Sequence, residues 1–251
     1  MLKSFRAAVI AAALLALPAV ALAAEFNDQQ RDEIGEIVRQ YLMQNPEVLL
    51  DVSKALEAKQ QEEEDKSRLA AVTENKDEIF HSANDFVAGN PQGDVTMVEF
   101  FDYNCSWCKK SMPEVMALLE EDKNLRLVLK EFPIFGEDSE YAARAALAAK
   151  RQDKYWPFHL AMLGHEGKIN KQNVDEIATQ QGLDMAKLKQ DMESDEIVGI
   201  VAANQELAQK LAITGTPGFI IDKTVVPGYL PKRALAEKIA AVRAEGGCTV
   251  C

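Results

Sequence analysis

The stretch that decides the fold is Val95–Pro113, which reads VTMVEFFDYNCSWCKKSMP. A run of β-forming apolar residues leads directly into Cys105-Ser106-Trp107-Cys108, and a segment of helical character follows. A thiol placed where a strand gives way to a helix lies at the helix N-terminus, where backbone N–H groups and the helix dipole favour the thiolate. Thiolates attack disulfides and bind soft metals, so this stretch predicts redox or metal chemistry.

The first 23 residues predict a signal peptide. Lys3 and Arg6 form a charged region, residues 7–17 form a short apolar region, and an Ala-Leu-Ala cleavage site follows at 21–23. A lone membrane anchor is the alternative, but the apolar run is short against the roughly 20 residues that a span needs. We therefore expect an exported, periplasmic protein, and association with the outer membrane stays open.

Length and charge narrow the class of protein further. The chain has 251 residues, enough for one large domain or for a domain with an appendage. Its formal net charge is −12, and loss of the signal peptide makes it two charges more negative. Such an acidic chain is a poor ligand for nucleic acid or for an anionic membrane, so we expect no nucleic-acid partner.

The four cysteines form two C-x-x-C pairs, Cys105/Cys108 and Cys248/Cys251. A disulfide bond within either pair closes a minimal loop and adds little stability through chain entropy. Redox or metal chemistry is therefore favoured over structural stapling. A structural zinc site at the first pair would need two more ligands at a compact spacing, which the three histidines do not offer.

Residues 24–80 predict an N-terminal helical extension. Residues 28–44 repeat apolar side chains at helical spacing, Asn45-Pro46 ends this helix, and an apolar stripe resumes over 48–56. The charged run 57–68 is typical of a solvated helix or a flexible connector. An apolar stripe of this kind has to be buried, and self-association is favoured over packing on the chain's own second domain.

The remainder of the chain predicts an α/β domain. The strands at 95–101 and 125–132, with a helix between them, form a right-handed βαβ unit with parallel pairing. The other expected elements are a short strand at 86–89, a helical block over 138–211, a strand hairpin at 218–222 and 224–226, and a closing helix at 231–244.

The residues around the first cysteine pair suggest separate roles. Cys105, nearer the strand, is expected to be the exposed nucleophile, and Cys108, one helical turn further on, the resolving thiol. Glu99 lies in an otherwise apolar strand, where a carboxylate must be paired or protonated unless it faces the surface. Lys130 in the neighbouring strand is its expected partner, and Glu99 is expected to accept the proton of Cys108 through water.

Thr216-Pro217 follows a loop and precedes a strand. A cis bond here has a prior of only about 5% from the sequence alone. A cis proline would expose the preceding backbone groups, which could then pair with an extended substrate as one strand pairs with another.

Three segments resemble the DsbA family of exported thiol–disulfide oxidoreductases. They are EFFDYNCSWCKKSMP at 99–113, LVLKEFPIFG at 127–136 and TGTPGFII at 214–221, and the similarity extends in order and spacing over about residues 28–245. More narrowly, the chain is similar to members with an N-terminal extension, such as ScsC and the 27 kDa outer-membrane-protein type.

This resemblance implies a thioredoxin fold with an inserted helical domain and an N-terminal helical arm. It implies a DsbA-like domain over 81–245, with the insertion at 138–211, and a cysteine-containing tail at 246–251. It also implies that the arm forms homo-oligomers, as in ScsC-like proteins, and that the substrates are proteins with disulfides or thiols, with an unidentified redox partner and no cofactor.

The resemblance also assigns the site residues. It implies Cys105 as nucleophile, Cys108 as resolving thiol and Pro217 as the cis proline, and Glu99 matches the buried carboxylate of the family by its offset from the first cysteine. We assign Thr216 and Trp107 to substrate binding.

Two departures leave the direction of the reaction open. Ser106-Trp107 replaces the Pro-His dipeptide of strongly oxidising DsbA proteins, and Thr216 is the residue found in known isomerases. The chain is therefore expected to act either as an oxidase or in the isomerase or reductase direction. Two rivals remain: a periplasmic copper-binding or copper-tolerance protein that uses the thiols as ligands, and a surface protein in which the fold is only a scaffold.

The tail with Cys248 and Cys251 lies outside the family pattern. It follows two glycines and is expected to be mobile. Its pair could relay electrons to the main pair, bind Cu(I), or form an inert disulfide.

Overall fold

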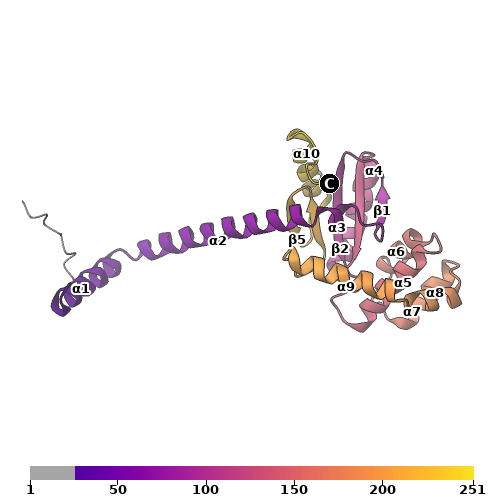
Figure 1. The fold of residues 1–251 in the computed structure, drawn as a ribbon, viewed down its shortest axis with the longest axis horizontal. Helices are drawn as coiled ribbons and strands as arrows, with labels where there is room; N and C mark the ends of the chain where they lie inside the picture. The colour runs from indigo at the N-terminus through magenta and orange to yellow at the C-terminus, as the bar shows by residue number, and fades with distance from the viewer. Residues whose placement is uncertain (1–25) are drawn as a thin grey trace, which may run out of the picture. The chain divides into compact units, whose positions relative to one another are not determined.

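The computed structural model describes residues 26–251, so the predicted signal peptide lies outside the described residues (Figure 1). The described residues divide into two compact units, the first ending at Ala58 and the second covering residues 59–251. The first unit holds helix α1 (Asp28–Gln44) and the beginning of helix α2 (Glu47–Glu74). The helix predicted over 28–44 is therefore confirmed, and the charged run 57–68 is helical within α2.

Helix α1 begins with a capping box. The Asn27 side chain accepts a hydrogen bond from the Gln30 backbone N–H, and the Gln30 side chain accepts one from the Asn27 backbone N–H. None of the residues of α1 is buried. The exposed apolar side chains of this unit are Phe26, Ile34, Ile37, Val38, Tyr41, Met43, Leu49, Leu50, Val52 and Leu56.

The second unit is built on a sheet of five strands in the order β1-β3-β2-β4-β5. The two central strands, β2 and β3, are parallel, and the other neighbours are antiparallel. The expected parallel βαβ unit and the hairpin of the last two strands are confirmed. The strands are β1 (Phe86–Gly89), β2 (Val95–Phe101), β3 (Leu125–Glu131), β4 (Gly218–Ile221) and β5 (Thr224–Pro227).

Helices cover both faces of this sheet. The chain after α2 forms α3 (Lys76–Phe80), α4 (Ser106–Glu121), α5 (Glu137–Lys150), α6 (Tyr155–Leu163), α7 (Lys171–Gln180), α8 (Met185–Met192), α9 (Asp195–Lys210) and α10 (Lys232–Ala244). The segment between β3 and β4 thus carries the expected helical block, which Figure 1 shows as α5 to α9.

The pleat of the sheet divides the core in two. The odd-numbered side chains of β2 and β3, such as Met97 and Leu127, pack with α4, α10 and the helical block. The even-numbered ones, such as Val98 and Val128, pack with the end of α2, α3 and the end of α9. Strand β2 is buried along its whole length, as its continuous apolar sequence predicts.

Between residues 26 and 251, the structure contains no helix that combines the length and the apolar character needed to cross a membrane.

Candidate functional site

Cys105 lies at the junction of β2 and α4. It is the N-cap of α4, and its Sγ accepts a hydrogen bond from the Cys108 backbone N–H at 3.4 Å. An N-cap side chain satisfies a helix N–H that has no partner within the helix, and a negative charge there is favoured by the helix dipole. The local sequence therefore places the first sulfur of the pair where a thiolate is stabilised.

The two sulfurs have opposite electrostatic environments. A hydrogen bond from the Cys108 side chain is the largest of the effects that lower the pKa of Cys105, from 9.0 to about 6. Burial raises the pKa of Cys108 well above its ordinary value. At neutral pH the reduced pair therefore holds one thiolate, at Cys105, and one thiol, at Cys108.

The prediction that Cys105 is exposed is wrong. Only 3% of its surface is exposed, and Cys108 is buried as well. The reason is that the backbone carbonyl of Thr216 lies 3.1 Å from the Cys105 sulfur and accepts a hydrogen bond from it when Cys105 is protonated. Trp107, in contrast, is 52% exposed, and Ser106 beside it is exposed as well.

The sheet topology brings Thr216 to this position from far along the chain. Strand β4 runs antiparallel to β2, and Gly218 at the start of β4 pairs with Phe100 near the end of β2. The segment that enters β4 therefore lies beside the cysteine that follows β2. The Thr216–Pro217 peptide bond in that segment is cis.

Glu99 and Lys130 do not form the expected pair. Glu99 is opposite Leu129 in the register of β2 and β3, whereas Lys130 is opposite Phe100 and so points to the other face of the sheet. The Lys130 ammonium instead forms a buried ion pair with Asp85 at 2.5 Å. The prediction fails because one residue of offset in a strand reverses the face to which a side chain points.

Among residues 26–251, Glu99 forms no ion pair. Burial and the charge of Cys105 raise its pKa from 4.5 to about 8, and the charge of Glu99 in turn raises the pKa of Cys108. The carboxyl group is therefore mostly protonated at pH 7. Glu99 lines a small internal cavity of about 10 Å³ together with α4 and α6 residues, including His159. A cavity of this size holds about one water molecule.

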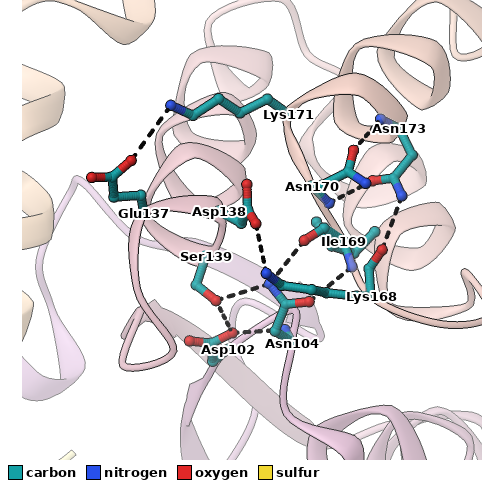
Figure 2. A network of polar contacts seen from close by, with 10 residues as sticks. All are labelled: Asp102, Asn104, Glu137, Asp138, Ser139, Lys168, Ile169, Asn170, Lys171 and Asn173. Carbon is teal, nitrogen blue, oxygen red and sulfur yellow. Dashed lines mark hydrogen bonds and ion pairs between the residues drawn. The ribbon is translucent and has the colours of Figure 1, made fainter.

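Asp102 organises the loop between β2 and Cys105, as Figure 2 shows in part. Its Oδ2 accepts hydrogen bonds from the backbone N–H groups of Ile134 and Phe135, and its Oδ1 accepts from the backbone N–H of Asn104 and the hydroxyl of Ser139. All four donors lie within 3.1 Å of the carboxylate. Asp102 thus joins the cysteine loop to the segment after β3 and to α5.

Asn104, the residue before Cys105, joins the same loop to the helical block (Figure 2). Its side-chain oxygen accepts from the Ile169 backbone N–H at 2.8 Å, and its amide nitrogen donates to the Ile169 carbonyl and to Ser139. The sequence analysis did not identify Asp102, Asn104 or Ser139. The signal available was a polar Asp-Tyr-Asn run placed directly after a buried strand.

A second buried polar cluster lies close by. Glu131 accepts hydrogen bonds from the hydroxyls of Tyr103 and Tyr155, at 3.0 and 2.7 Å, and the Tyr103 hydroxyl is 3.0 Å from Nδ1 of His159. Burial raises the pKa of Glu131 well above its usual range and lowers that of His159 to about 3. The cluster is therefore a set of neutral groups, and the sequence analysis did not identify it.

Trp107 packs against the loop that follows β5. Its ring centroid is 5.5 Å from that of Tyr229, and the Lys110 ammonium lies 4.8 Å from both centroids. The exposed face beside the cysteines is therefore both aromatic and cationic.

The 246–251 tail packs on the sheet rather than extending free. Cys248 and Cys251 form a disulfide bond, and Asp222, in the turn after β4, accepts hydrogen bonds from the backbone N–H groups of Thr249 and Val250. Asp222 is at the end of β4 opposite Pro217, so the tail is at the other end of this strand from Thr216. Asp222, Cys248 and Cys251 also form a group of possible metal ligands. Within the described part of the chain, their ligand atoms all lie within 4.8 Å of one another.

Two family models match the chain. The model described as "DSBA-like thioredoxin domain" matches residues 96–240, which is more than half of the chain. The model described as "Copper resistance protein ScsC N-terminal domain" matches residues 30–63, which correspond to α1 and the first half of α2.

Two solved structures are similar over most of the chain. A thioredoxin-like oxidoreductase from Silicibacter pomeroyi DSS-3 is 47% identical, with a TM-score of 0.67, and the match covers 68% of this chain and 98% of that one. BcfH from Salmonella enterica Typhimurium is 29% identical, with a TM-score of 0.72, over 84% of this chain and 95% of that one.

Curated relatives match over shorter fractions of their length. The chain spans 26% of the length of the Na(+)/H(+) antiporter NhaA 3 of Salinispora tropica, at 27% identity over 65% of this chain. It spans 73% of the length of a probable disulfide bond formation protein D from Bacillus cereus, at 28% identity over 58% of this chain.

Proposed function

This chain belongs to the family of DSBA-like thioredoxin domains, and on that premise we propose that it is an exported thiol–disulfide oxidoreductase that acts on proteins through Cys105 and Cys108. The observation that carries the proposal is the pairing of an N-terminal helix thiolate with a buried thiol one turn away. A disulfide-exchanging pair needs this asymmetry, because one sulfur has to attack while the other waits as a thiol.

In the reductive direction, the Cys105 thiolate attacks one sulfur of a substrate disulfide. A bond forms between Cys105 and the substrate, and the other substrate sulfur leaves as a thiolate. Cys108 then loses its proton and attacks Cys105, so that the pair becomes a disulfide and the substrate leaves with both cysteines reduced. Started from the disulfide, the same steps run in reverse and oxidise a substrate dithiol.

Glu99 is suited to take the proton of Cys108. Its pKa is raised first by burial and second by the negative charge on Cys105. Once Cys105 is in a mixed disulfide it carries no charge, so the second cause disappears and the pKa of Glu99 falls. A more acidic Glu99 is more often ionised, and it then accepts the Cys108 proton through a water molecule in the adjoining cavity.

Thr216 and Trp107 are proposed to hold the substrate. The Thr216 carbonyl lies 3.1 Å from the Cys105 sulfur, where it can pair with the backbone of an extended polypeptide. Trp107, in the first turn of α4, offers a large exposed aromatic surface close in sequence to Cys105.

The first unit is proposed to join copies of this chain. Its described residues expose ten large apolar side chains to water, and exposed apolar side chains in such number favour burial against a partner. The match of residues 30–63 to the N-terminal domain of ScsC supports a dedicated role for this segment. The periplasm is the proposed location, because the pair needs a compartment in which disulfides persist.

The proposed function is tested with the Cys105→Ser variant of the mature chain. We expect this variant to lose both the reduction of a model protein disulfide and the refolding of a scrambled substrate. A double Cys248→Ser, Cys251→Ser variant is the matched control and should retain both activities. Activity in the Cys105 variant would refute the assignment.

Copper binding through the same thiols is the second candidate. It is suggested by the description of the family model that matches residues 30–63. The two are separated by one comparison: stoichiometric uptake of Cu(I) by the reduced chain without turnover of any disulfide would favour the copper role, whereas turnover favours the oxidoreductase.

A further inference from the structure

A pocket of about 150 Å³ opens beside Thr216, the residue whose carbonyl lies 3.1 Å from the sulfur of Cys105. Its walls come from three places in the second unit: the segment that leads into Pro217, the end of β5, and Arg68 of α2. The Gly228 backbone N–H donates to the Pro217 carbonyl at 2.9 Å, so one wall of the pocket is tied to the segment that carries Thr216.

The lining of the pocket is mostly apolar, and its polar side chains are those of Arg68, Thr214 and Thr216. Ile213, Val225 and Pro227 supply the apolar wall. The Thr216 hydroxyl is buried, and its side-chain hydrogen bond is one of the effects that lower the pKa of Cys105, so this hydroxyl faces the sulfur. The group left to bind a ligand in the pocket is therefore Arg68.

Arg68 supplies the positive charge of the lining. Its side chain is 30% exposed, and its ion pairs with Glu64 at 3.4 Å and Asp65 at 3.8 Å join it to strongly exposed carboxylates of its own helix. Exposed pairs of this kind contribute little, so they do not prevent the guanidinium from binding another acid. A guanidinium has five donors and binds a carboxylate with two parallel hydrogen bonds.

From this arrangement we infer that the pocket binds an acidic side chain of the substrate polypeptide, Asp or Glu, close in sequence to the cysteine that reacts with Cys105. The inference rests on the proposed function and adds a substrate preference to it. Thr216 is the link, because its carbonyl faces the Cys105 sulfur while the residue also lines the pocket. In an extended chain, side chains two positions apart lie on the same face, so the positions to test are two residues before and two residues after the cysteine.

The test uses short peptides that carry one cysteine in a mixed disulfide with 5-thio-2-nitrobenzoate, whose release is followed by absorbance. The peptides differ only in a Glu, Gln, Leu or Lys placed two residues before or two residues after the cysteine. With the reduced mature chain as the stoichiometric reductant, we expect the second-order rate constant of thionitrobenzoate release to be about tenfold higher with Glu than with Lys at one of the two positions.

Arg68→Gln should remove this preference while the Gln peptide is reduced at the wild-type rate. Arg68→Lys keeps the positive charge and should retain part of the preference. Continued reduction of the Gln peptide by Arg68→Gln shows that this variant is folded. Arg233→Gln, a change to an exposed arginine of α10, is the matched control and should leave the preference intact.

Three results would overturn the inference. A wild-type chain that does not discriminate between the peptides has no acidic subsite, and a higher rate with Leu than with Glu assigns the pocket to apolar side chains. A preference that persists in Arg68→Gln places the subsite elsewhere. If the chain reduces none of the peptides, the result contradicts the proposed oxidoreductase activity itself. The inference about the pocket, which rests on that activity, is then contradicted as well.

Discussion

Cys105 and Cys108 differ in reactivity although only two residues separate them. The first is the N-cap of a helix and receives hydrogen bonds from both the backbone and the side chain of the second. The second lies inside the helix, where burial disfavours its charge. The chemistry therefore depends on where a helix begins, because a shift of the helix start by one turn would exchange the two environments.

Alkylation of the reduced chain by iodoacetamide measures this asymmetry. We expect the rate at Cys105 to rise with pH about a midpoint near 6 and to level off by pH 8, because the pKa of this thiol is lowered from 9.0 to about 6. In Cys108→Ala the strongest stabilising hydrogen bond is absent, so the midpoint should move toward 9. An unchanged midpoint in that variant would show that Cys108 does not stabilise the thiolate.

Glu99 should make the stability of the reduced chain depend on pH. Its folded pKa of about 8 lies above the unfolded value near 4.5, so the stabilising contribution is complete below pH 4.5 and is lost as pH rises through 8. Glu99→Gln cannot ionise and should escape this loss. Relative to wild type, the variant should gain on the order of 3 kcal/mol in free energy of unfolding between pH 4.5 and pH 7.5.

Urea unfolding of both chains under reducing conditions, at several pH values, gives this difference directly. Ionisation of Cys105 stabilises the folded chain as pH rises above 6, which is opposite in sign to the effect of Glu99. Because both chains contain Cys105, its contribution cancels to first order in the comparison. A difference that does not change with pH would mean that Glu99 is ionised in the folded chain.

Sequence could identify Glu99 as buried but not its surroundings. The apolar run around it predicts burial, whereas its neighbour across the sheet depends on the register of two strands. Lys130 lies in the neighbouring strand, which suggests a pair with Glu99. The pleat of the sheet, however, directs Lys130 to the opposite face, where it pairs with Asp85. The exposure of Cys105 was mispredicted for a related reason, since the segment that covers it comes from 111 residues away.

The loop from β2 to α4 is held by Asp102, which receives hydrogen bonds from the segment after β3 and from α5. The β2–α4 junction itself is predictable, because strand-forming residues end and a helix start follows within a few positions. The contacts that hold it are not, since they join loops that are separated by more than 30 residues.

Replacement of Asp102 by Ala should destabilise the chain by about 3 kcal/mol, because it removes the charged acceptor of three partly buried backbone N–H groups and of the Ser139 hydroxyl. The same variant should slow alkylation of Cys105 at pH 7, since the cysteine loses its fixed position at the helix start. Asp32→Ala, on exposed α1, is the control for loss of one carboxylate. Equal stability of the Asp102 and Asp32 variants would contradict the role of the loop contacts.

Assembly of the whole molecule is proposed to depend on residues before Lys59. Helix α2 crosses from the first unit into the second, and Val72 near its end is fully buried in the core of the second unit. A truncation that tests assembly should therefore keep Val72. A chain that starts at Asn75 would remove a core residue along with the proposed interface.

Light scattering of size-separated protein compares three chains: the mature protein, a form that starts at Lys59, and the full mature chain with Ile37→Glu. We expect a multiple of the monomer mass for the first and the monomer mass for the other two, because Ile37 is 65% exposed in the single chain and a charge there opposes burial between copies. Equal monomer masses for all three would end the proposal of self-association.

The most direct test of the account is to trap the covalent intermediate. The mature Cys108→Ser variant is reduced, mixed with a disulfide-containing protein substrate, quenched with acid and digested, and the cross-linked peptides are identified by mass spectrometry. The account predicts a mixed disulfide at Cys105 that accumulates in this variant and is absent from Cys105→Ser. Cross-links found only at Cys248 or Cys251, or none at all, would contradict it.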